Sequence, residues 1–219
     1  MPSSTEASRP LRSDALRNRA LLIDAARELF AERGVDVALE EVARRAGVSI
    51  GTLYNRFPIR AALIEAVFAD RLEKIAGYAM AALADPDPWH GFADYLVNVC
   101  ELQAVDRGFN EVAARGLADS PANQGLRRQV GDAMNQLIER AKQAGAVRAD
   151  LAMEDLAFVV WGIAQTVERT ANSAPRLWRR HLALLLDGFR AEGAHPLPEP
   201  PLRPDQSHAA VPECDSPTK

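Results

Sequence analysis

The chain has 219 residues, of which 47% are hydrophobic and 26% are charged, and this composition is that of a folded globular protein. Two cysteines, Cys100 and Cys214, and four scattered histidines disfavour a disulfide framework and a metal site, so we expect no metal and no cofactor. Because no apolar run is long enough to span a membrane and no secretory signal is visible at the N-terminus, we expect a cytoplasmic protein.

The net charge of −4 is distributed unevenly along the chain. Residues 1–60 carry ten arginines against eight acidic residues, whereas the rest of the chain is net acidic. A slightly basic end on an acidic body favours an anionic partner at that end. The asymmetry is small, and a GC-rich genome also produces arginine-rich chains, so charge alone does not identify the partner.

The N-terminal part of the chain is predicted to be an arm followed by a helix. Residues 1–12 are polar and contain two prolines, so we expect them to be flexible. A helix is predicted over about 14–33, because apolar residues recur on one face from Leu22 to Phe30 and Gly34 follows as a stop.

Two short helices and one long helix are predicted next. The short ones are expected over about 39–46 and 50–57, joined by a turn that contains Gly47. Pro58 ends the second of them, because proline disfavours helical backbone at the residue before it. The long helix is predicted from about 59 to 84, where alternating aspartates and prolines end it.

Five further helices are predicted in the rest of the chain, and none of its runs alternates long enough for a half-buried strand. They are expected over about 89–105, 107–116, 121–144, 153–172 and 175–191. Residues 194–219 hold seven of the fourteen prolines and almost no large apolar side chain, so we expect a disordered tail.

The segment from Leu39 to Arg60 has the pattern that points to a function. Two short helices joined by a glycine-containing turn form a helix-turn-helix, expected over about 38–57. Helical spacing directs Leu53 and Phe57 inward and leaves small, polar and aromatic residues on the opposite face. Such a face suits the major groove of DNA, which admits one helix. Similar helix pairs also occur in folds that bind no DNA, so the pattern alone leaves both interpretations open.

Individual residues of this segment suggest particular contacts with DNA. Gly51 would let the backbone approach the bases closely, and Asn55 is suited to pair with adenine. Tyr54 and Arg56 are suited to reach phosphates or base edges. Ser49 is suited to cap the second helix and to hold a phosphate at its N-terminus.

Residues 14–75 resemble the DNA-binding domain of the TetR family of bacterial one-component transcriptional regulators. The matching runs are AARELFAERG at 25–34 and VARRAGVSIGTLYNRFPIRAAL at 42–63, and the core AGVSxGTLYxxF at 46–57 is specific to that family. The resemblance implies an all-α fold of about nine helices. It comprises an N-terminal three-helix helix-turn-helix DNA-binding domain and a C-terminal helical domain for ligand binding and dimerisation.

The resemblance also implies domain limits and DNA-binding residues. The DNA-binding domain is expected over 13–75 and the regulatory domain over 76–193, between the arm at 1–12 and the tail at 194–219. The expected DNA-binding residues are Arg12, Ser49, Ile50, Gly51, Thr52, Tyr54, Asn55, Arg56 and Arg60.

Four positions within this match need comment. Arg60 stands where the family usually carries a lysine that contacts a phosphate. Ala38 stands where a threonine or serine usually caps the first short helix, and losing that cap would cost about 1 kcal/mol. Ile50 replaces a residue that is often polar and is suited to contact a thymine methyl group. Arg56 stands where histidine is common.

The last two predicted helices are the expected homodimer interface, because their apolar stripes need partners and the family pairs these helices. The alternative is that the stripes form only the core of one chain. The expected interface residues are Leu156, Val160, Ile163, Val167, Leu182, Leu185, Leu186 and Phe189.

A small-molecule pocket is expected among the middle helices of the regulatory domain, again by resemblance. The mixture of apolar, aromatic and a few polar residues favours an uncharged or weakly polar effector. The expected pocket residues are Trp89, Phe92, Tyr95, Leu96, Val99, Cys100, Gln103, Phe109, Met134, Leu137, Phe158, Trp161 and Gln165.

The sequence therefore predicts a homodimeric repressor that binds a palindromic operator in double-stranded DNA. An unidentified small-molecule effector would release it by shifting the long helix at 59–84. A ligand-dependent activator, a corepressor-type regulator and a helical interaction protein that has lost operator binding are the alternatives. We expect no enzyme, because the chain lacks the phosphate-binding, GxSxG and HExxH motifs.

Overall fold

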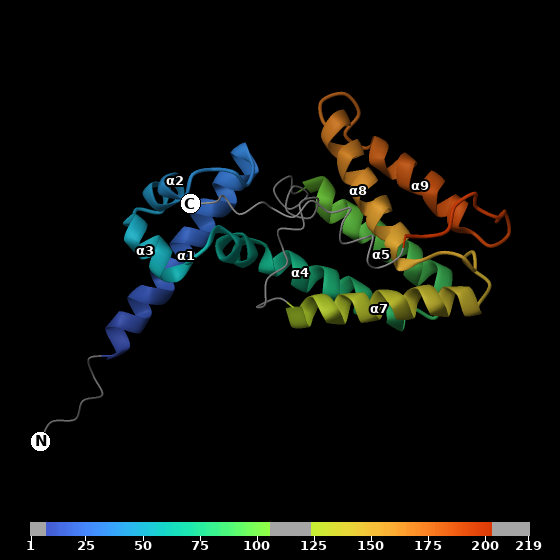
Figure 1. The fold of residues 1–219 in the computed structure, drawn as a ribbon, viewed down its shortest axis with the longest axis horizontal. Coiled ribbons are helices and arrows are strands. Elements are labelled where there is room, and N and C mark those ends of the chain that lie inside the picture. Colours follow the sequence, from blue (N-terminus) through green and yellow to red (C-terminus); the bar gives the residue numbers. More distant parts are fainter. Residues whose placement is uncertain (1–7, 106–123, 203–219) are drawn as a thin grey trace, which may run out of the picture. The chain divides into compact units, whose positions relative to one another are not determined.

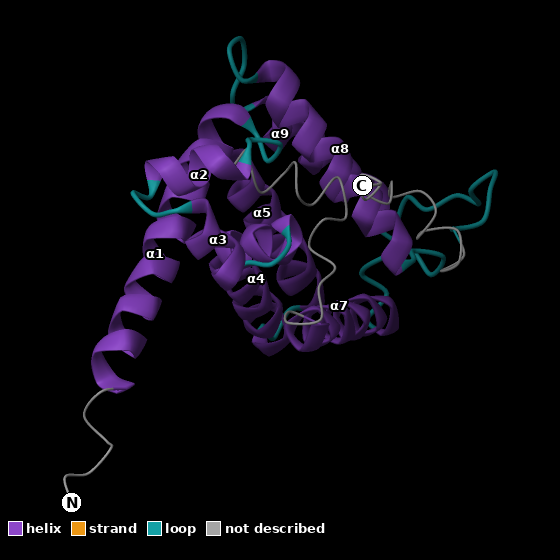
Figure 2. Ribbon diagram, turned by 60° about the vertical axis from the view of Figure 1, so that its left-hand side comes forward, coloured by secondary structure: helices purple, strands orange, loops and turns teal. Residues whose placement is uncertain are grey.

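The computed structural model describes residues 8–105 and 124–202, with side chains from residue 14 onwards. Over these ranges it consists of helices and loops (Figures 1 and 2), which confirms the predicted all-α fold. The helices are α1 (Ser8–Arg33), α2 (Leu39–Arg45), α3 (Ile50–Arg56), α4 (Arg60–Ala84), α5 (Pro88–Val105), α7 (Gln124–Gln143), α8 (Met153–Thr170) and α9 (Leu177–Phe189). The helix predicted over 107–116 lies outside the described residues.

The chain divides into two compact units, residues 1–69 and 70–219. The division falls inside α4, which is one continuous helix from Arg60 to Ala84. The boundary predicted at 75–76 lies in the same helix, where no break in composition marks the passage from one unit to the other.

The first helix begins earlier than predicted. α1 begins at Ser8, so residues 8–12 of the predicted flexible arm are helical. Pro10 is compatible with this start, because the N–H groups of a first helical turn have no acceptor within the helix.

The core of the first unit is built by the faces that the helical spacing predicted. Leu22, Leu29 and Phe30 of α1 are fully buried, and Phe30 stacks on Phe68 of α4 with the ring centroids 6.3 Å apart. Gly34 has a φ of 83°, and its N–H bonds to the carbonyl of Phe30, which ends α1.

The second unit is organised around α5, which packs against α7, α8 and α9. Its buried residues include Phe92, whose ring forms a T-shaped pair with the Phe189 ring of α9, with the centroids 6.3 Å apart. An isolated antiparallel bridge joins Val147, after α7, to Arg190, after α9. The guanidinium of Arg148 donates to the carbonyl of His195 at 2.7 Å, so the beginning of the predicted tail is held to the second unit.

None of the described helices is both long and apolar enough to cross a membrane.

Candidate nucleic-acid interface

The second helix of the helix-turn-helix, α3, is held in place from its start to its end. Ser49 caps it, since its Oγ accepts a hydrogen bond from the backbone N–H of Thr52 at 3.1 Å and lies 2.9 Å from the Thr52 hydroxyl. Leu53 and Phe57 are buried, as predicted. The guanidinium of Arg19 in α1 lies over the Phe57 ring, 5.5 Å from its centroid.

The opposite face of α3 is open to solvent. Ile50 is 36% exposed and Tyr54 is 46% exposed, and their spacing of four residues places them side by side on the helix. Gly51, Asn55 and Arg56 are exposed as well. The turn before the helix depends on Gly47, which has a φ of 70°. The local fold therefore presents small, aromatic and hydrogen-bonding groups together on one short helix.

Ion pairs fasten α2 to α1. Arg33 of α1 forms a two-pronged pair with Glu41 of α2, with both N–O distances at 2.7 Å, and this hydrogen bonding lowers the pKa of Glu41. Arg45 of α2 lies 3.2 Å from Glu32 and 3.3 Å from Glu28 of α1. The basic charge of Arg45 is therefore directed at α1, and these pairs orient the helix on which α3 packs.

Arg60 makes two hydrogen bonds within its own unit. Its Nη1 donates to the carbonyl oxygens of Val35 and Val37, at 2.8 Å each. Both hydrogens of Nη1 are thus engaged within the chain, and the phosphate contact expected of Arg60 stays a prediction. The side chain of Arg12, another expected DNA-binding residue, lies outside the described side chains.

Most of the expected pocket residues are buried in the second unit. Those of α5 and α7 are buried except Trp89, which is half-buried beneath the guanidinium of Arg190, 3.8 Å from the ring centroid. Burial raises the pKa of the Cys100 thiol to about 12 and also raises that of Tyr95. The buried members are Phe92, Tyr95, Leu96, Val99, Cys100, Gln103, Met134 and Leu137.

For three of the expected pocket residues, the prediction of an interior position is wrong. Phe158 and Trp161 are 42% and 49% exposed on α8, with their rings 6.2 Å apart, and Gln165 is exposed as well. The helix α8 has apolar residues on more than one face, and periodicity does not say which face turns inward. Phe109 lies outside the described residues.

Several residues that were expected at the dimer interface are buried inside the chain. Leu156 and Ile163 of α8 and Leu182 of α9 are buried within the chain, so their assignment to a surface between chains is wrong. The alternative that these stripes form the core of one chain holds for them, because α8 packs on α9 and on α5. The remaining expected residues are half-buried: Val160, Val167, Leu185, Leu186 and Phe189.

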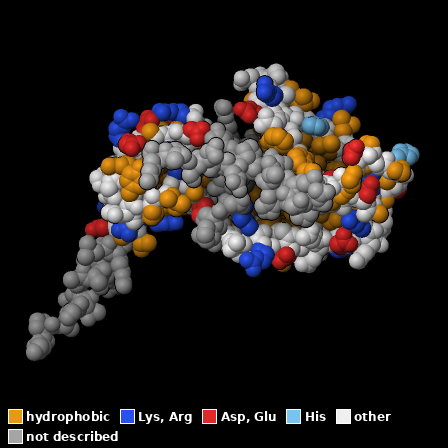
Figure 3. Space-filling view, viewed as in Figure 1, with side chains coloured by type: hydrophobic (Ala, Val, Ile, Leu, Met, Phe, Trp, Pro, Cys, Tyr) orange, Lys and Arg blue, Asp and Glu red, His pale blue; other side chains and the backbone are white. Residues whose placement is uncertain are grey.

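The surface of α8 and α9 nevertheless carries apolar side chains. Hydrophobic groups gather on the visible face of the molecule over these two helices (Figure 3). The large exposed ones are Phe158, Trp161, Leu177 and Leu184.

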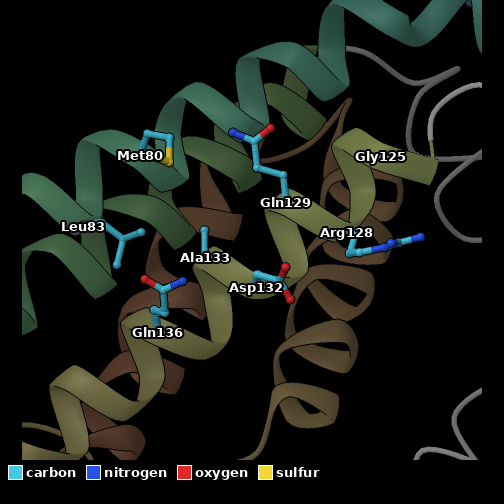
Figure 4. Close-up of a pocket in the computed structure, with 8 residues that line it drawn as sticks. All are labelled: Met80, Leu83, Gly125, Arg128, Gln129, Asp132, Ala133 and Gln136. Atoms are coloured by element: carbon cyan, nitrogen blue, oxygen red, sulfur yellow. The ribbon is translucent and has the colours of Figure 1, made fainter.

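A groove of about 340 Å³ lies between the C-terminal half of α4 and α7 (Figure 4). Met80 and Leu83 of α4 line it with apolar side chains, α7 contributes mostly polar ones, and none of the expected pocket residues lines it. Sequence reasoning missed it because the lining residues of α7 are polar and resemble an ordinary solvent-facing stripe. The lining residues are Met80, Leu83, Gly125, Arg128, Gln129, Asp132, Ala133 and Gln136.

Two segments of the chain match described families. Residues 22–67 match bacterial regulatory proteins of the tetR family, and residues 87–191 match the C-terminal domain of SbtR-like transcriptional regulators. The two matches therefore cover both the helix-turn-helix and the helices α5 to α9.

Known proteins similar to this chain are regulators of the same kind. The crystal structure of a TetR transcriptional regulator from Streptomyces coelicolor is 30% identical, with a TM-score of 0.50, and the match covers 78% of this chain and 98% of that one. RolR, whose structure is known in complex with the ligand resorcinol, is 27% identical to this chain, with a TM-score of 0.52. The match covers 86% of this chain and 98% of RolR. The HTH-type transcriptional regulator UidR of Escherichia coli is 26% identical over 150 residues, which are 64% of this chain and 74% of UidR.

Proposed function

The chain belongs to the TetR family of DNA-binding transcriptional regulators, and from that membership we propose that it is a homodimeric repressor. The repressor binds a palindromic operator and leaves it when a small molecule binds the second unit. It acts in the cytoplasm, where its DNA lies, and we propose no catalytic role for it.

The observation that supports the DNA-reading surface is the exposed face of α3. Ile50 and Tyr54 offer apolar and aromatic surface to thymine methyl groups and the sugar–phosphate backbone, and Asn55 offers an amide to adenine. Gly51 lets the helix backbone come close to the base edges. Arg56 adds a cation for a phosphate or a guanine.

The outward apolar face of α8 and α9 is the proposed dimer surface. Phe158 and Trp161 form a pair of exposed aromatic rings there, and Leu177 and Leu184 of α9 are exposed as well. Aromatic residues of this kind anchor protein interfaces, and covering them in a second copy removes them from water. A two-fold dimer would present two α3 helices to half-sites about 34–36 Å apart, which requires an inverted repeat.

The effector is proposed to bind the second unit. RolR, a relative that covers most of this chain, is described with resorcinol bound, and a mostly apolar interior with few polar groups suits a small uncharged ligand here too. Binding is proposed to shift α4, which is continuous from the second unit into the first. Release from DNA then requires a difference in effector affinity between the two states, typically about 1–3 kcal/mol of coupling.

In-vitro selection of genomic DNA fragments by the purified protein at near-physiological salt tests this function. An inverted repeat protected by the protein is the expected result, and Tyr54→Ala should abolish selection while leaving the dimer intact in light scattering. The products of the genes beside the selected sites suggest which small molecules to test as effectors. The true effector should release the protein from the DNA.

Other results would contradict parts of this assignment. A selected repeat that is bound only in the presence of a small molecule would indicate a corepressor-type regulator or an activator. Salt-sensitive binding without any motif would indicate a helical interaction protein that has lost its operator.

A further inference from the structure

Arg60, the first residue of α4, makes contacts that a phosphate-binding residue does not need. Its Nη1 donates to the carbonyl oxygens of Val35 and Val37, both at 2.8 Å. These acceptors lie 25 and 23 residues earlier in the chain, in the connection between α1 and α2. One guanidinium nitrogen therefore uses both of its hydrogens to hold this connection.

The connection leads directly into the helix-turn-helix, and the start of α2 lacks a side-chain cap. Ala38 precedes α2, and its side chain makes no hydrogen bond to the first turn. A serine or threonine hydroxyl there would accept a bond from a first-turn N–H and stabilise the start of the helix. The buried side chains of Val35 and Val37 and the two bonds to Arg60 fix the connection instead.

Arginine is well suited to such a role. A charged donor makes stronger hydrogen bonds to carbonyl groups than a neutral one does, and its planar fork keeps a defined geometry. Arg60 is half-buried, whereas Arg56 at the end of α3 is exposed. The two arginines thus differ in what they can offer to DNA.

Given the proposed DNA-binding function, we propose that Arg60 is a positioning residue that holds the start of α2 in place of the missing cap at Ala38. Because α2 packs against both α1 and α3, the orientation of its first turn sets the orientation of the reading face. Arg60 acts on DNA binding through this connection and not through a phosphate.

A double-mutant cycle in the full-length protein distinguishes the two roles, with binding to the selected operator measured over a series of salt concentrations. Arg60→Met keeps much of the aliphatic stem but removes the donors, Arg60→Lys keeps the charge, and Ala38→Ser adds a cap. A positioning role predicts that both Arg60 variants weaken binding about tenfold or more, with the slope of log affinity against log salt unchanged. It also predicts that Ala38→Ser strengthens Arg60→Met by a larger factor than it strengthens the wild type.

A direct bond to a phosphate predicts a different pattern, and this pattern would overturn the assignment. Arg60→Lys would keep the affinity and the slope, and Arg60→Met would lower the slope by about 0.9 for each phosphate that it no longer neutralises. Ala38→Ser would then change both backgrounds by the same factor. DNA reading by α3 would stand in that case.

Amide hydrogen exchange provides a readout that does not depend on DNA. In both Arg60 variants the N–H groups of Glu41 and Val42, which bond to the Ala38 carbonyl, should exchange about tenfold faster, and Ala38→Ser should reverse this. Unchanged exchange at these two amides would overturn the positioning role. A uniform increase over residues 14–69 without reversal by Ala38→Ser would show a role in stability only and would also overturn it. Failure of the wild type to select any operator would overturn the proposed function instead.

Discussion

Glycine at position 51 is not required by the fold but is required by the proposed contact with DNA. A Cβ added there would meet only the Ser49 hydroxyl, at 3.8 Å, which is an ordinary contact. Glycine in a helix costs about 1 kcal/mol relative to alanine, and no contact of Gly51 with the described residues offsets this cost. Gly47, by contrast, has a φ of 70° and is required by the turn itself.

Gly51→Ala should therefore change stability and DNA binding in opposite directions. We expect the free energy of unfolding to rise by up to about 1 kcal/mol, because alanine favours the helix. Operator affinity should fall about tenfold or more, because the new methyl group separates the backbone from the bases. Thermal unfolding and a binding titration measure the two effects.

Gly131→Ala is the matched control for this prediction. Gly131 lies in α7, where an added Cβ meets no described atom within 4 Å. The substitution should therefore also stabilise the protein but leave operator binding unchanged. Unaltered operator binding in Gly51→Ala would show that the backbone of α3 does not approach the DNA closely.

At the scale of elements, the junction between α4 and α5 is a closely packed contact of the second unit. Gly91 of α5 is buried against the end of α4, and an added Cβ would lie 2.4 Å from the carbonyl oxygen of Ala82. Arg140 of α7 donates to the carbonyls of Leu83, at 3.0 Å, and of Asp85. The end of α4 is thus held by a close backbone approach on one side and by an arginine on another.

Gly91→Ala should destabilise the second unit. The clash with backbone atoms leaves no flexible side chain to move aside, so α5 must shift, at a cost of about 1–3 kcal/mol. Differential scanning calorimetry of the full-length protein measures this loss, with Gly131→Ala again as the control. An unfolding temperature equal to that of the wild type would show that the junction is loosely packed.

The same junction predicts a dependence of stability on pH. Nδ1 of His90 lies 2.7 Å from Asp85 and its Nε2 lies 3.2 Å from Asp94. The hydrogen bond with Asp85 raises the pKa of His90 above 6.5, and the bond from His90 lowers the pKa of Asp85 below 3.8. The contribution of protonated His90 to the free energy of unfolding is complete below the pKa of the histidine in the unfolded chain. It is lost as the pH rises through the raised pKa of the folded state. The contribution of ionised Asp85 to the free energy of unfolding is lost as the pH falls through the lowered pKa of the folded state.

The stabilisation from this contact should therefore be largest between about pH 4 and pH 6.5 and should decline above that range. The wild type should lose more thermal stability between pH 6 and pH 8 than His90→Gln, which cannot carry the charge. Parallel unfolding temperatures of the two proteins across that interval would contradict a stabilising contact at His90.

At the scale of the whole molecule, the two faces of α8 and α9 have separate uses. The inner face holds Leu156, Ile163 and Leu182 in the core of the second unit, and the outer face carries Phe158 and Trp161. A regulator that reads an inverted repeat needs two copies of α3, and the outer face is where we propose that the copies meet.

Trp161→Glu should convert the dimer into a monomer at micromolar concentration. A carboxylate at the centre of an apolar interface must be desolvated, so the dissociation constant of the dimer should rise about thirtyfold or more. Sedimentation velocity measures the change, and circular dichroism should show an unaltered helix content. Met80→Glu, at an exposed apolar residue of α4, should leave the dimer intact. A Trp161→Glu protein that stays dimeric would place the interface elsewhere.

Much of the helical layout followed from local chemistry. Leu22, Leu29, Leu53 and Phe57 are spaced so that one helix face buries them, and Gly34 and Gly47 stand where the backbone must turn. These signals act over a few residues, and so the helices from α2 to α9 begin and end within about three residues of the predicted limits wherever both are described. The reading face of α3 could be predicted for the same reason.

What the sequence alone determined is the class of fold, the helix-turn-helix and the exposed composition of α3, because each depends on periodicity and turn residues within one short segment. The tertiary structure decided which apolar face of α8 turns inward, because Leu156 and Trp161 are both large and hydrophobic, and the packing of α8 on α5 and α9 buries only Leu156. It also decided the partner of Arg60, because the carbonyls of Val35 and Val37 come within reach only when α1, α2 and α4 fold together.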